Sequence, residues 1–138
     1  MKPALIWTFI SGILTLSIFI PTINQNKSIN GYIYYFHSLN CHQNSQSSFV
    51  IMGKQVAVCS RCTGIYLGAF LSGLILIFFK IKTKQYPYYL LLCVPMLLDV
   101  IALHLKFYEP ILLLKSITGL LASVGVTLTI LPRLNRTN

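Results

Sequence analysis

Long uninterrupted runs of apolar residues constrain the fold of this chain more than any other feature. They occupy residues 4–23, 62–79, 88–105 and 111–131. A helix of about 20 apolar residues is long enough to cross the hydrocarbon core of a bilayer. The sequence therefore predicts an all-α integral membrane bundle with four transmembrane helices, in one domain over residues 1–138.

The composition agrees with this class of protein. Hydrophobic residues make up 55% of the 138 residues and charged residues only 9%, with a mean hydropathy of +0.71. Soluble domains carry about a quarter charged residues, so this chain has too few polar side chains to cover a water-facing surface. The formal net charge is +9, but the basic residues flank the apolar runs, as membrane anchors do. The expected partner is the lipid bilayer, and nucleic-acid binding is not expected.

The basic flanks also predict an orientation. Four spans place both termini on the same side as the short turn at residues 80–87, which carries three lysines. Lys2, Arg133 and Arg136 lie on that side, close to helix ends, where positive charge marks the cytoplasmic face. We therefore expect a multi-pass protein of the cell membrane with cytoplasmic termini and with its polar first loop, residues 24–61, outside.

The first loop holds a group of residues with metal-ligand character. Cys41-His42 is followed by a C-x-x-C motif at residues 59–62. Such a motif places two thiols together, and a further Cys and His complete a tetrahedral Cys₃His set for zinc, copper or an iron centre. The predicted metal ligands are Cys41, His42, Cys59 and Cys62. Adjacent residues cannot both ligate without a bent backbone, so Cys41 alone, or His37 in place of His42, is an alternative.

The same thiols allow a second interpretation, a membrane thiol–disulfide oxidoreductase. A C-x-x-C motif at a helix N-terminus has a lowered thiol pKa, because the helix dipole and the nearby Arg61 favour the thiolate. Here Cys59 and Cys62 would form the active pair and Cys41 would resolve it, while Cys93 is a packed thiol in the third span. A third interpretation is a structural or accessory membrane subunit without catalysis. The sequence does not decide whether the chain is an enzyme, and it leaves a homo-oligomer or another membrane partner open.

A carboxylate lies inside the third apolar run. Asp99 is about 9 Å from the end of this span, and Lys115 is about 6 Å into the fourth, at 1.5 Å per residue. An intramembrane carboxylate usually finds a partner, and the helix directions place Lys115, Arg61 and His104 at the same end as the cysteines. We predict that these four residues form an ion pair or surround the metal ligands. A purely structural ion pair is the alternative.

The longest motif in the chain is C-x-R-C-T-G-I-Y-x-G, within residues 58–68, and other short motifs accompany it. These are Cys41-His42-Gln43, Ser48-Phe49, Gly53, Asp99 and Thr118-Gly119. Over about residues 33–125 the chain resembles the bacterial and archaeal membrane proteins called domain of unknown function 2085. The resemblance implies the membrane class and the cysteine motif rather than a mechanism. The family tends to carry Arg where this chain has Ser47 and Lys115, so bidentate guanidinium chemistry is not expected at those positions.

Overall fold

The computed structural model describes residues 2–79, 86–105 and 111–134. The predicted turn with its lysines at residues 80, 82 and 84, together with Lys106, the Glu109-Pro110 turn and Arg136, lies outside the described residues. In chain order the elements are α1 (Lys2–Ser17), α2 (Ile20–Ile23), α3 (Lys27–Ser38), η1 (Ser45–Ser47), β1 (Val50–Ile51), β2 (Lys54–Gln55), α4 (Ser60–Phe78), α5 (Tyr86–Tyr89), η3 (Leu90–Cys93), α6 (Val94–His104) and α7 (Leu112–Leu134).

Three of the described helical segments are long and apolar enough to cross a membrane. They are Pro3–Ile23, Ser60–Phe78 and Leu112–Arg133, with mean hydropathies of 2.0, 1.7 and 1.7. A fourth apolar segment, Leu90–His104, is shorter. It begins as a 3₁₀ turn, and Pro95 stands at the start of α6, where a proline without an N–H is tolerated. The prediction of a mostly helical membrane protein is confirmed.

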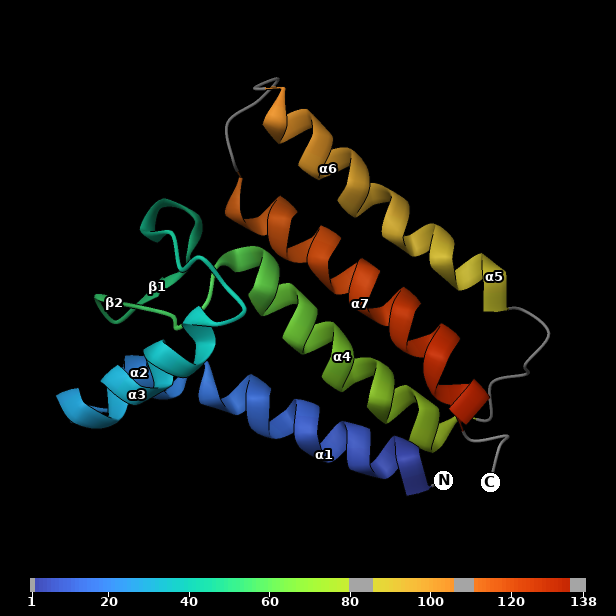
Figure 1. Cartoon of the computed structure of the whole chain (residues 1–138), viewed down its shortest axis with the longest axis horizontal. Helices are drawn as coiled ribbons and strands as arrows, with labels where there is room; N and C mark the ends of the chain where they lie inside the picture. Colours follow the sequence, from blue (N-terminus) through green and yellow to red (C-terminus); the bar gives the residue numbers. More distant parts are fainter. Residues whose placement is uncertain (1, 80–85, 106–110, 135–138) are drawn as a thin grey trace.

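The long helices lie side by side in one layer, in the order α1, α4, α7 and α6 (Figure 1). The closest approach is between α4 and α7. A Cβ added at Gly64 would meet the backbone of Ser116, and a Cβ added at Gly68 would meet the backbone of Leu120. Small residues allow membrane helices to approach closely in this way, so both glycines are packing residues of the α4–α7 contact.

The first loop folds as a polar cap at one end of the layer, next to the end of α1 and the start of α4 (Figure 1). We call residues 24–59 the cap. It contains α3 and a two-stranded hairpin, so the all-α prediction was wrong in this loop. The hairpin pairs Val50 with Gln55 and Ile51 with Lys54. Its two turn residues, Met52 and Gly53, both have positive φ, which suits the tight turn that joins twisted strands.

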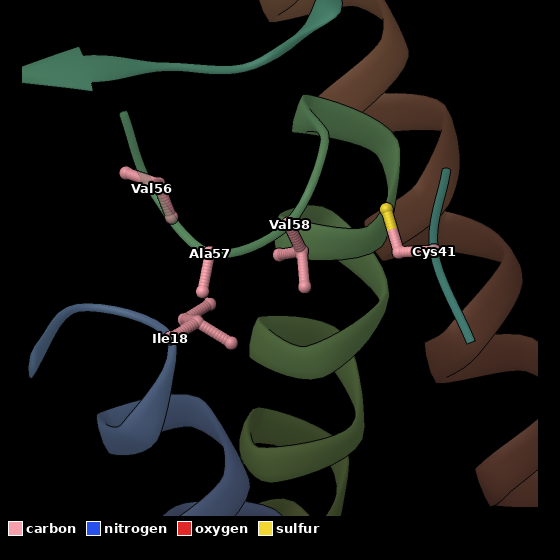
Figure 2. Packing of buried hydrophobic residues seen from close by; sticks show 5 residues of the cluster. All are labelled: Ile18, Cys41, Val56, Ala57 and Val58. Carbon is pink, nitrogen blue, oxygen red and sulfur yellow. The ribbon is translucent and has the colours of Figure 1, made fainter. Parts of the chain in front are cut away.

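The cap is anchored to α1 by a small buried core. Ile18 and the extended segment Val56–Val58 are fully buried, and Cys41 is buried in the same cluster. In Figure 2, Ile18 at the end of α1 lies beside Ala57 and Val58, and Cys41 comes from a separate segment next to the first turn of α4. The Ala57 N–H also donates to the Ile18 carbonyl oxygen at 3.2 Å. This core fixes where the chain enters α4 and therefore where the C-x-x-C motif lies.

Candidate metal centre

Three of the predicted ligands come together where the cap meets α4. Cys41 follows α3, Cys59 is the N-cap of α4 and Cys62 lies in its first turn. Their sulfur atoms all lie within 4.8 Å of one another, and none is in a disulfide. With a Zn–S bond of about 2.3 Å, tetrahedral ligands have sulfur atoms about 3.8 Å apart. Closing the thiols on an ion thus needs a contraction of about 1 Å at most, and the donor set fits a soft or borderline cation.

Gln43 fixes the position of Cys41. Its backbone has a φ of 49°, a left-handed conformation that is uncommon for a residue other than glycine. This turn directs the Gln43 side chain inward, where its amide donates to the carbonyl oxygens of Tyr34 at 2.7 Å and Ala57 at 2.9 Å. The Gln43 carbonyl oxygen accepts from the Gln55 side chain at 2.9 Å. Through its side chain and its backbone carbonyl oxygen, Gln43 therefore ties α3, the hairpin and the approach to α4 together.

The start of α4 holds the other two thiols against Cys41. The Cys59 side chain makes no capping hydrogen bond, so its thiol is free to face the group. The Cys59 N–H donates to the Cys41 sulfur at 3.2 Å, and in Figure 2 this sulfur points toward the first turn of α4. Cys62 reaches the same place because it lies three residues after the N-cap, almost one helical turn later.

The surroundings of Cys41 favour its thiolate. Hydrogen bonds from the Cys59 thiol, the Cys62 thiol and the Cys59 N–H hold the pKa of Cys41 well below its usual value, although burial acts in the opposite direction. The N-terminus of α4 adds a positive dipole end beside the group. The thiolate is the form that ligates metals and attacks disulfides. The predicted lowering of a thiol pKa thus appears at Cys41, outside the C-x-x-C motif itself.

The two histidines of the cap lie in different environments. His42 is exposed, whereas His37 is 0% exposed. The His37 ring shares a hydrogen bond with the Ser17 hydroxyl through Nε2 at 2.9 Å, while Nδ1 is buried without a hydrogen-bond partner among the described residues. Burial lowers the pKa of His37, with the Cys41 charge opposing this, so its imidazole is neutral. Neither histidine belongs to the group of three sulfurs.

The predicted charged residues lie at the same end of the helices. Asp99 is ion-paired with Arg61. Lys115 donates to the Ser47 hydroxyl at 3.0 Å, which ties the start of α7 to the cap. His104 is exposed in the last turn of α6. Of the three residues predicted near Asp99, Arg61 is its ion-pair partner.

Comparisons with known proteins place the chain among membrane proteins. Residues 41–129 match a family described as predicted membrane proteins, DUF2085. The chain is 39% identical over 121 residues to MJ1492, an uncharacterised protein of Methanocaldococcus jannaschii, covering 80% of this chain and 74% of that protein. It is 38% identical over 88 residues to an uncharacterised protein of Methanothermobacter thermautotrophicus, covering 62% of this chain and 79% of that protein. No solved structure matches this chain significantly.

Proposed function

The chain belongs to the DUF2085 family of predicted membrane proteins, and we propose that it binds a metal ion through Cys41, Cys59 and Cys62. The observation that carries this proposal is the convergence of three unbridged sulfur atoms, from two separate segments, within 4.8 Å. Three thiolates suit zinc, copper(I) or an iron centre and do not suit magnesium or calcium, which prefer oxygen ligands.

For the fourth ligand we propose His37 in place of His42. His37 is neutral and buried, with an unpartnered Nδ1, and its backbone oxygen accepts the Cys41 N–H at 3.0 Å. A hydrogen bond to the second ring nitrogen orients a ligating histidine, and here Ser17 makes such a bond with Nε2. His42 is exposed and adjacent to Cys41. Ligation by His37 requires its side chain to move toward the sulfur atoms when the ion binds.

The membrane arrangement that we propose has four spans in one domain. α5, η3 and α6 follow one another in line beside α7 (Figure 1), and residues 86–104 at 1.5 Å per residue extend about 28 Å. This is close to the thickness of the hydrocarbon core. Four spans in the cell membrane with cytoplasmic termini place the cap and the thiols at the outer face. Labelling of single cysteines added in the cap or near the N-terminus, by an impermeant maleimide on intact cells, tests this topology.

Metal analysis of the full chain, purified in mild detergent without chelator, tests the metal proposal. We expect close to one equivalent of metal in the wild type and in Cys93→Ser, because the Cys93 thiol lies apart from the other three and contacts the Ala122 carbonyl oxygen. Cys59→Ser should lose the metal. His37→Ala should weaken binding, and imidazole added to this variant should restore it, while His42→Ala should bind like the wild type. Metal-free wild type after reconstitution with zinc or copper(I) would overturn the proposal.

A thiol–disulfide oxidoreductase is the second candidate function. It is favoured by the stabilised Cys41 thiolate, which lies within reach of both cysteines of the C-x-x-C motif. In this reaction Cys59 and Cys62 would lose two electrons and two protons to an acceptor and form one disulfide. This candidate would be favoured over the first if the protein binds no metal and its thiols undergo a reversible two-electron oxidation that Cys62→Ser abolishes.

A further inference from the structure

We propose that Lys115, Arg61 and Ser47 form an anion site that takes a phosphate group at the rim of the membrane. This site uses none of the three thiols, and the proposal does not depend on metal binding. It rests on a buried positive charge that the described residues leave without a counter-charge.

The packing of α4 against α7 brings Arg61 close to the turn of α7 that carries Lys115. A Cβ added at Gly119 would meet the Arg61 carbonyl oxygen and would lie 3.3 Å from Arg61 Cγ, so Arg61 lies across α7 at this position. Lys115 is four residues before Gly119 on the same helix. Residues four apart share a helix face and differ by about 6 Å along the axis. Arg61, in the first turn of α4, therefore packs against the face of α7 that also carries Lys115, about one helical turn away.

The charges at this place do not balance. Asp99, with its side chain 3% exposed, is paired with Arg61. Lys115 is only 8% exposed, and among the described residues no carboxylate lies within 4.0 Å of its ammonium group. An ammonium group has three donors, and the hydrogen bond of Lys115 to the Ser47 hydroxyl uses one of them. The Arg61 Nε is buried and has no hydrogen-bond partner in the described part of the chain.

A bound phosphate group would neutralise the unpaired positive charge. A buried charge is costly unless it is paired and hydrogen-bonded. An ammonium, a guanidinium and a hydroxyl together offer several donors, which is what the oxygen atoms of a phosphate accept. The site also lies at the cap end of the helices, and where helices cross a bilayer the lipid phosphates lie near the helix ends. Arg61, with its side chain 22% exposed, leaves a route of entry. The phosphate can come from a lipid headgroup or from inorganic phosphate.

The test measures the thermal stability of the full chain with and without a phosphate source. One arm adds inorganic phosphate to protein in a maltoside detergent, which contains no phosphate. The other arm compares nanodiscs of neutral galactolipid with nanodiscs that also contain phosphatidylglycerol. We expect the wild type to be stabilised in at least one arm. Stabilisation only by phosphatidylglycerol identifies a lipid source, and stabilisation also by inorganic phosphate identifies a free anion.

Substitution of Lys115 decides whether this residue carries the effect. Lys115→Met should weaken the apparent phosphate affinity by roughly tenfold or more, the loss expected for a hydrogen bond to a charged group. Without phosphate, this variant should be at least as stable as the wild type, because an unpaired buried charge has been removed. Lys115→Arg should retain binding, and Lys27→Met, which changes an exposed lysine of the cap, should behave like the wild type.

Two results would overturn the anion site. One is equal stabilisation of wild type and Lys115→Met by phosphate, which would show that Lys115 takes no part in binding. The other is the absence of any stabilisation of the wild type in both arms, which would show that the chain binds neither inorganic phosphate nor the lipid phosphate. Metal content serves as a separate measurement, since it should be unchanged in Lys115→Met.

Discussion

Replacement of Gly64 by alanine tests whether the close approach of α4 and α7 holds the candidate site together. The added Cβ would overlap the Ser116 carbonyl oxygen and would lie 2.8 Å from the Ser116 carbonyl carbon and 3.0 Å from the Leu120 nitrogen. All three are backbone atoms and cannot rotate away as a side chain would. The two helices must therefore move apart, and the turn of α4 that carries Arg61 and Cys62 moves with them.

The expected change in the free energy of unfolding is the sum of two opposing contributions. Alanine is favoured over glycine in a helix interior by about 0.5–1 kcal/mol. Overpacking a tight contact costs about 1–3 kcal/mol, and here the cost lies at the upper end because backbone meets backbone. Gly64→Ala should therefore lower the free energy of unfolding by about 1–2 kcal/mol.

Gly31→Ala in α3 is the matched control, because an added Cβ there meets nothing within 4 Å. It should raise the free energy of unfolding by about 0.5–1 kcal/mol, so the two variants should differ by about 2 kcal/mol. The assay is reversible unfolding of both variants in detergent micelles, followed by circular dichroism, with metal content measured on the same samples. Equal stability of Gly64→Ala and Gly31→Ala would refute the close approach of the helices.

Further predictions concern single polar contacts. Asp99→Asn should lower the free energy of unfolding by about 2 kcal/mol, which is less than the loss for a fully buried ion pair, because Arg61 is partly exposed. In a double-mutant cycle with Arg61→Gln, a coupling energy below about 0.5 kcal/mol would contradict the ion pair. Tyr34 donates its hydroxyl to the Gln55 carbonyl oxygen, so Tyr34→Phe should cost about 1 kcal/mol in unfolding at pH 8. Burial raises the pKa of Tyr34 above its usual value of 10.0; stability should then fall as the pH rises above 10, where the unfolded chain loses this proton first, and the Phe variant should lack that part of the decline. The Thr15 hydroxyl donates to the Tyr66 carbonyl oxygen at 3.1 Å. Thr15→Val removes this hydrogen bond and should lower the free energy of unfolding by about 0.6 kcal/mol. An unchanged free energy of unfolding would argue against that contact.

The membrane class could be predicted from the sequence because it depends on a property that is local in the chain. A long apolar run is a spanning candidate whatever its neighbours are. The shorter α6 was harder to delimit, since η3 and the start of α6 differ in backbone geometry and not in hydropathy. The hairpin in the cap was not predicted, because its strands are two residues each and show no alternation that a sequence pattern could reveal.

The candidate site was predictable only in part. Spacing along the helices brought Asp99, Lys115 and Arg61 to one end, but rotation of each helix about its axis decides which cation meets Asp99. Proximity in the sequence favoured His42 over His37, whereas the environments of the two rings depend on how α3 ends. Gln43 looked like an ordinary loop residue, and its role depends on a left-handed backbone that the sequence does not signal.

The division of the three thiols between two segments has a consequence for the order of assembly in the cell. Cys41 leaves the ribosome first, and the residue whose N–H binds its sulfur follows 18 residues later. The segment that seats the cap on α1, residues 56–58, immediately precedes Cys59, so neither the cap nor the thiol group is complete until α4 begins to enter the bilayer. An ion that needs all three sulfur atoms can therefore be captured only after the first turn of α4 has been synthesised.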